Sequence, residues 1–266
     1  MADFLHMADS FSNDHDYLPI SSMIGHLFEA ILVLTGDIRS RALQTAETVA
    51  ISTLDAIGWA PESGESQTAA MLRDQLFAQG AMMGNRKILE YLVNLFDAWS
   101  NGTAIAPDLA RGVLTAGAVS KGQTALDLLI RRFEKSNIEH ERMTIAGALG
   151  SLGQWPVLEK ALAYSLEKIP DRIRFMPLVS SAGNPAGVDR LWHWFEKNMS
   201  AMQRMHPLLL ERVVAAMVPV PGLMDPARAR SFCNGLVEKQ PRLKDVIALS
   251  LERLSVNIDW RERNER

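Results

Sequence analysis

The feature that most constrains the fold of this chain is a pair of apolar helical patterns separated by a sharp turn, over residues 169–199. After the turn, apolar side chains recur at intervals of three and four residues, which places them on one stripe of a helix. This stripe consists of Val188, Leu191, Trp192, Phe195 and Met199. The turn is Asn184-Pro185-Ala186-Gly187, in which proline cannot extend the first helix and glycine can adopt the backbone angles of a corner. The segment therefore predicts a helix, a turn and a second helix.

The rest of the chain repeats this unit with different residues. Stripes of helical period predict helices over residues 20–34, 37–57, 67–80, 85–99, 107–120, 122–135, 139–151 and 241–260. Roughly 13 or 14 helices result, with no convincing strand. The spacing from one hairpin to the next is about 35 to 45 residues, which is typical of HEAT and armadillo repeats. We therefore predict an all-α fold, a HEAT/armadillo-like superhelical array of antiparallel helix hairpins.

Several helix starts carry capping signals. Asp37 is expected to cap the helix that follows Gly36. Ser136 and Glu139 have the spacing of a capping box. Asp225 directly precedes a proline, which combines a capping residue with a favoured first helical position.

Composition excludes several classes of protein. The net charge of −3 gives no general attraction to nucleic acid. The only cysteine, Cys233, excludes an intrachain disulfide and a cysteine-rich metal site. No apolar run reaches the roughly 18 residues that a membrane span needs, and the first residues lack the basic-then-apolar order of a signal peptide. We expect a soluble chain with no membrane partner, whose compartment the sequence does not specify.

No motif carries self-evident chemistry. His140-Glu141 begins like the His-Glu-x-x-His motif of zinc peptidases, but the fifth position is Thr144, and one imidazole cannot hold the metal. The three histidines nearest the N-terminus lie in different predicted environments: His6, His15 and His26. We therefore predict no metal site and no catalytic residue in this chain.

Three arginines near the central turn could form a basic site. Arg172, Arg174 and Arg190 could together bind a carboxylate, because a guanidinium pairs with such groups through two hydrogen bonds. The alternative is that they are solvated arginines on the surface of a helical array.

Five segments, in the correct order, resemble the C-terminal helical domain of zinc aminopeptidases of the aminopeptidase N type, which also occurs in the antigen-trimming aminopeptidases of the endoplasmic reticulum. The resemblance covers almost the whole chain from about Phe4. The matching segments are Met71-Leu72-Arg73 with Gln75-Leu76; Phe96 and Trp99 with Ile105, Pro107, Asp108 and Leu109; Ala148-Leu149 with Leu158; Asn184-Pro185 with Gly187, Trp192, Phe195, Asn198 and Met199; and Leu251 with Asn257-Ile258, Trp260 and Asn264.

The resemblance implies a bowl of HEAT-like hairpins that caps a separate catalytic domain and controls which peptides enter its chamber. Residues 1–266 would form a single such domain, with the catalytic domain and peptide substrates as partners. Zinc is expected in the missing catalytic domain, because this chain lacks the Gly-x-Met-Glu-Asn motif, a complete His-Glu-x-x-His and a downstream zinc-binding glutamate. The implied chamber-facing residues are Arg174, Asn184 and Arg190.

The sequence departs from the family where Met176 and Pro177 follow Arg174, since relatives often have glutamine and an acid there. Ala30, Ile31 and Ser151 stand near positions that hold a peptide's C-terminus in the antigen-trimming enzymes, so we transfer no such site. Two other functions stay open. One is a free-standing α-solenoid that binds a partner on its concave face. The other is a hydrolase built on His140-Glu141.

Overall fold

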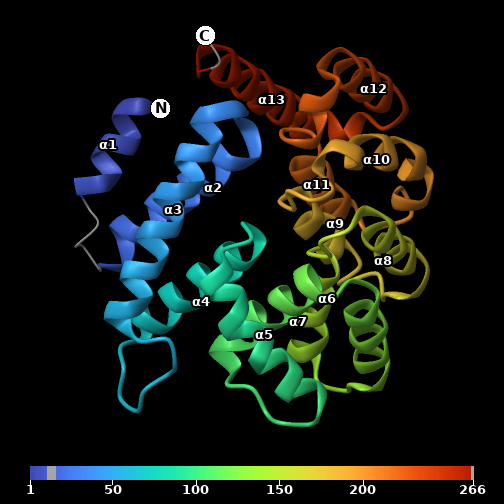
Figure 1. Cartoon of the computed structure of the whole chain (residues 1–266). Coiled ribbons are helices and arrows are strands. Elements are labelled where there is room, and N and C mark those ends of the chain that lie inside the picture. The colour runs from blue at the N-terminus through green and yellow to red at the C-terminus, as the bar shows by residue number, and fades with distance from the viewer. Residues whose placement is uncertain (11–15, 265–266) are drawn as a thin grey trace. The chain divides into compact units, whose positions relative to one another are not determined.

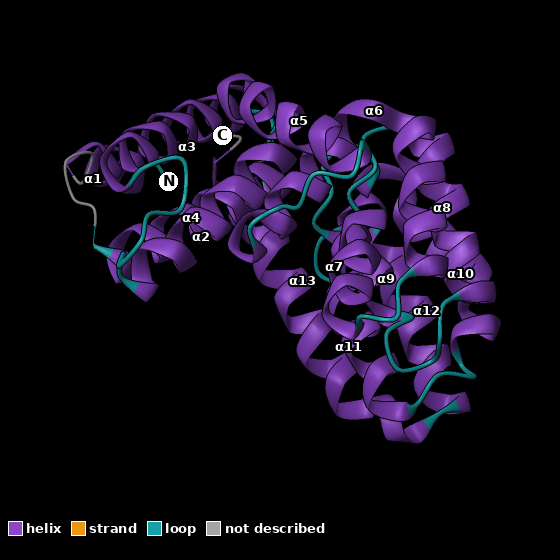
Figure 2. Ribbon diagram, turned by 90° about the horizontal axis from the view of Figure 1, so that it is seen from below, coloured by secondary structure: helices purple, strands orange, loops and turns teal. Residues whose placement is uncertain are grey.

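A computed structural model describes residues 1–10 and 16–264, and this part of the chain contains helices and no strand (Figure 1). Figure 2 shows the helices joined by loops. The helices are α1 (Ala2–Ser10), α2 (Tyr17–Val33), α3 (Gly36–Ile57), α4 (Gln67–Met82), α5 (Arg86–Ser100), α6 (Pro107–Lys135), α7 (Glu139–Leu149), α8 (Trp155–Lys168), α9 (Phe175–Ala182), α10 (Val188–Met202), α11 (Pro207–Met217), α12 (Pro226–Lys239) and α13 (Lys244–Asn264), with short 3-10 helices at Pro221–Met224 and Pro241–Leu243. The predicted all-α class is confirmed. Within the described ranges, no helix combines the length and the hydropathy that a membrane span requires.

The chain forms two compact units that divide at Gly122. In the first, α2 packs against α3 and α4, α1 packs against α3, and α4 packs against α5. The buried face of α3 carries the small residues Ala42, Ala46 and Ala50, which leave little side chain between neighbouring backbones.

The second unit is arranged around the short helix α9, which contacts α7, α8, α10 and α11. The sequence predicts a helix from Ile169, but regular helix begins only at Phe175. Pro177 explains the difference, because its ring would clash with the carbonyl of Ile173 in a continuous helix. The intervening residues form a turn in which the Arg174 backbone N–H donates to Pro170 O at 3.0 Å.

Some predicted caps are confirmed and others are wrong. Asp225 Oδ1 accepts from the Arg228 backbone N–H at 3.0 Å, as predicted. The Ser136–Glu139 capping box does not form: Ser136 Oγ accepts from the Ile138 N–H, and the N-cap position belongs to Ile138. Asp37 lies inside the first turn of α3, because the helix begins one residue earlier, at Gly36.

The predicted break between residues 120 and 122 is confirmed inside α6. Gly122 has φ 52° and ψ −124°, angles that are not helical and that a residue with a Cβ rarely adopts. The apolar stripes on the two sides of this glycine therefore belong to different helical segments.

A buried arginine holds the first unit together at the end of α3. Arg73, on α4, has a fully buried side chain, and its Nε donates to Gly58 O at 2.8 Å while Nη2 donates to Ile57 O at 3.1 Å. The same guanidinium bonds both carboxylate oxygens of Glu65, at 2.9 and 2.5 Å. One side chain thus ties the last carbonyls of α3 and the loop after it to α4.

We predict that Gly150→Ala destabilises the second unit. A Cβ at this position would lie 2.4 Å from Pro177 O and 2.8 Å from Ser181 N, and these backbone atoms cannot move aside easily. The expected cost in unfolding free energy is about 1–3 kcal/mol, measured by urea denaturation. Gly147→Ala is the matched control: nothing lies within 4 Å of its added Cβ, so stability should rise by up to about 1 kcal/mol. Equal effects of the two substitutions would contradict this packing.

Replacement of Arg73 should be among the most damaging changes in the chain. Arg73→Ala removes the donors to two carbonyls and leaves Glu65 without its partner, so we expect a loss of about 3 kcal/mol or more. Arg86→Ala, whose side chain is 90% exposed and paired with Glu90, should change stability by less than about 1 kcal/mol.

The same pair makes stability depend on pH. Hydrogen bonds from Arg73 lower the pKa of Glu65 from its ordinary value of 4.5. The stabilisation is therefore present above pH 4.5 and is lost as pH falls through the lower folded-state pKa. Urea denaturation between pH 6 and pH 3 should show that the unfolding free energy falls more steeply for the parent chain than for Glu65→Gln. Parallel curves for the two chains would refute the role of the Arg73–Glu65 pair.

Candidate functional site

Asn184 occupies the turn between α9 and α10, and its side chain is an anchor for the turn before α8. The residue is 2% exposed. Its Nδ2 donates to Gly150 O at 3.0 Å and to Leu152 O at 2.9 Å, and its Oδ1 accepts from the Ala186 N–H at 3.0 Å. Every polar atom of the amide therefore has a partner, and these bonds fix the distance between the α7–α8 connection and the α9–α10 connection. The sequence did not indicate this structural role. Contact of Asn184 with a peptide stays a prediction.

The structure corrects the expected reason for Gly187. Its φ is −129°, which other residues can adopt, so the corner does not require glycine for its backbone angles. A Cβ there would instead lie 2.6 Å from Leu158 Cδ2 and 3.3 Å from the Trp155 ring. Glycine leaves room at this point, where α10 begins against the side chains of α8.

Two of the three predicted arginines already have acidic partners. Arg174 has a side chain only 16% exposed, with Nε donating to Ile169 O at 2.9 Å and a second nitrogen 2.9 Å from Asp171 Oδ1. Arg172 forms an ion pair with Glu139 on α7. The proposed joint carboxylate site stays a prediction, but these contacts give Arg172 and Arg174 separate local roles.

Arg190 differs from the other two arginines. It lies on the exposed face at the start of α10, and within the described ranges its side chain makes no hydrogen bond or ion pair. Of the predicted site residues, it has the guanidinium most available to a ligand.

Two of the residues that we considered as catalytic candidates are hydrogen-bonded or buried within the fold. Glu141 accepts from Arg132 Nε at 2.6 Å and from Ser136 Oγ at 2.5 Å. Burial, with a smaller contribution from the nearby Glu196, raises the pKa of Cys233 to about 12, so its thiol stays protonated at neutral pH. His15 lies outside the described residues. Across residues 1–10 and 16–264, no three His, Cys, Asp or Glu side chains form a group that could hold a metal ion.

Other residues that carry the family resemblance also join neighbouring elements. Gln75 exchanges hydrogen bonds with Ser21 of α2, and Asn257 Nδ2 donates to Pro219 O at 2.9 Å. The Phe96 ring occupies the space where a Cβ on Gly117 would stand, at 2.2 Å. These motifs therefore specify how helices pack.

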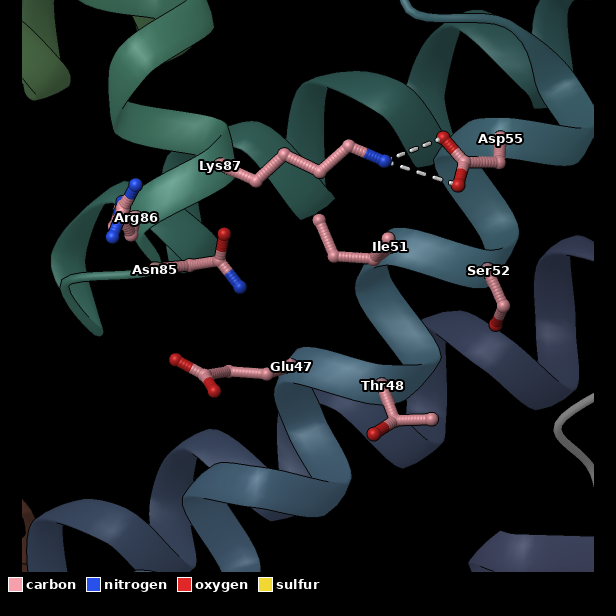
Figure 3. Close-up of a pocket in the computed structure, with 8 residues that line it drawn as sticks. All are labelled: Glu47, Thr48, Ile51, Ser52, Asp55, Asn85, Arg86 and Lys87. Atoms are coloured by element: carbon pink, nitrogen blue, oxygen red, sulfur yellow. Dashed lines mark hydrogen bonds and ion pairs between the residues drawn. The ribbon is translucent and has the colours of Figure 1, made fainter.

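Sequence reasoning missed a cavity of about 570 Å³ in the first unit, between α3 and the start of α5 (Figure 3). Its lining comes from residues 47–55 and 85–87. No sequence pattern could reveal it, because the two segments are more than a helix apart and become neighbours only through packing.

We predict that Asn184→Ala costs about 2 kcal/mol or more in unfolding free energy, since it leaves two buried carbonyls and one N–H without partners. Asn184→Asp should cost more, because a carboxylate oxygen would face the two carbonyl oxygens. Asn198→Ala is the control, since its amide bonds only Trp194 O within its own helix. Urea denaturation at pH 7 measures all three, and an Asn184→Ala effect no larger than the control would contradict the anchor role.

The family model and the similar proteins both indicate the aminopeptidases. The model of the ERAP1-like C-terminal domain matches residues 1–254. The chain is 21% identical to Aminopeptidase M1 of Arabidopsis thaliana over 98% of its own length, which is 31% of the plant protein. It is 23% identical to the alanine/arginine aminopeptidase of Saccharomyces cerevisiae and 24% identical to the human glutamyl aminopeptidase, over 59% and 58% of this chain and 19% and 16% of those proteins.

The chain thus spans about a third, or less, of the curated relatives it matches. The family match covers nearly all the described helices, including the Arg73 and Asn184 anchors. The chain therefore belongs to the family of ERAP1-like C-terminal domains, the helical C-terminal part of metallopeptidase-family aminopeptidases.

Proposed function

We propose that residues 1–266 act as one non-catalytic C-terminal domain of a zinc aminopeptidase, which caps the catalytic chamber and controls the entry of peptides. The observation that carries the proposal is the match of 98% of this chain to 31% of an aminopeptidase. A region of about a third of the enzyme is long enough to form one covering domain, beside the longer part that this chain does not match. The proposed partners are the catalytic domain of the parent enzyme and its peptide substrate.

The proposal assigns the hydrolysis, and the zinc that supports it, to the rest of the parent enzyme. The chain's own best fragment of a zinc motif, His140-Glu141, does not fit that role, because Glu141 is bonded to Arg132 and Ser136. The groups this domain would offer a peptide are surface side chains. Arg190 is our first choice, since it is exposed and could pair with a carboxylate of the peptide.

The isolated chain should not hydrolyse aminoacyl reporter substrates, whereas the parent enzyme that contains it should hydrolyse them. Turnover by the isolated chain that a chelator abolishes would overturn the proposal, and loss of such turnover in Glu141→Gln would favour the hydrolase instead. A reading frame without any peptidase domain would favour the free-standing solenoid.

Within the parent enzyme, Arg190→Glu should raise KM for acidic peptides of several residues roughly two- to fivefold, the worth of one exposed ion pair. Turnover of a single-residue reporter should not change, because such a substrate is too short to reach this domain. Arg204→Glu, an exposed arginine after α10, is the matched control. If the two variants behave alike on both substrates, Arg190 has no role in peptide entry.

A further inference from the structure

The cavity between α3 and α5 is largely open to solvent and has the size of a ligand site. Its volume of about 570 Å³ lies within the range of roughly 300–1,000 Å³ that small-molecule pockets occupy. Figure 3 shows side chains of α3 on one side and the start of α5 on the other. The lining residues are Glu47, Thr48, Ile51, Ser52, Asp55, Asn85, Arg86 and Lys87.

Most of the charges around this cavity are already compensated by one another. Lys87 Nζ lies 3.1 Å from both carboxylate oxygens of Asp55 and 4.9 Å from the centre of the Trp59 ring. Arg86 Nε donates to Glu90 at 2.8 Å and points along its own helix. Both cations are therefore held by partners and directed away from Glu47.

Glu47 is the remaining charge in the lining. It extends from α3 toward the start of α5, and no other described side chain or backbone group bonds its carboxylate. The local field in the cavity is thus negative at this point, and a cationic group would be attracted to it.

Asn85 supplies a hydrogen-bond donor that faces the same space. The residue is 4% exposed, and its Oδ1 accepts from the Ile88 backbone N–H at 3.0 Å as the N-cap of α5. This bond fixes which end of the amide is oxygen, so Nδ2 must point the other way, into the cavity (Figure 3). Nδ2 has no bonding partner among residues 1–10 and 16–264.

We propose that this cavity binds a peptide segment with a lysine side chain. The ammonium pairs with Glu47, the aliphatic stem lies along Ile51, and the backbone carbonyl of the bound residue accepts from Asn85 Nδ2. A carboxylate ligand would instead meet the uncompensated charge of Glu47. A metal ion lacks a third acidic or histidine ligand in this cavity. The site stands on its own geometry and does not depend on the function proposed above.

The test uses the 266-residue chain with N-acetyl-lysine methylamide, which carries the ammonium, the stem and a backbone carbonyl. Backbone amide NMR spectra should show saturable shifts confined to residues 47–55 and 85–89. N-acetyl-norleucine methylamide has the same stem without the charge, and it should bind roughly tenfold more weakly, as expected for one charge-assisted hydrogen bond. Binding of the lysine probe should also weaken as salt is raised.

Two substitutions separate the proposed contacts. Glu47→Gln should weaken the lysine probe roughly tenfold and leave the norleucine probe unchanged. Asn85→Ser keeps a capping oxygen for α5 but removes Nδ2, so it should weaken both probes. Glu159→Gln, an exposed glutamate on α8, is the control and should change neither. The proposal would be overturned by equal affinity of the two probes, by chemical shift changes outside residues 47–55 and 85–89, or by unchanged binding in Glu47→Gln. Thermal melts confirm that each variant is folded.

Discussion

The structure depends on side chains that satisfy backbone carbonyl groups at the ends of helices and in the connections that follow them. The last four carbonyls of every helix lack a partner within it, and a chain of many short helices has many such ends to bury. Arg73 donates to Ile57 O and Gly58 O, Asn184 to Gly150 O and Leu152 O, and Asn257 to Pro219 O. In each case the donor lies on a later segment, so the bond also holds two helices at a fixed distance.

The sequence predicted the helices well because local chemistry decides them. Apolar stripes mark α2 and α10, proline ends or begins helices, and Gly122 breaks α6 where the pattern changes. The wrong or missing predictions concern side chains whose partners depend on how the chain folds. Nothing local distinguishes Ser136 as a partner of Glu141 from Ser136 as a cap. Nor does a leucine–arginine pair reveal that Arg73 is fully buried, because Glu65 and the end of α3 are brought to it only by folding.

The same argument explains why the family could be recognised more readily than the site. The residues that carry the resemblance are largely those that fix the packing of neighbouring helices, such as Asn184 and Gln75. Their identity follows from the fold, and a fold alone does not specify a substrate. The residues free to meet a ligand, Arg190 and Glu47, are surface side chains with no motif around them. Sequence patterns therefore report architecture here and say little about binding.

The state of Cys233 makes this chain a convenient host for chemical probes. It is the only cysteine, it is 1% exposed, and its thiol stays protonated at neutral pH. Alkylating dyes react with the thiolate, so the native chain should remain largely unlabelled. A single exposed cysteine, for example Thr48→Cys beside the cavity, would then carry a fluorophore or spin label at one defined place, without first removing the native residue from the core.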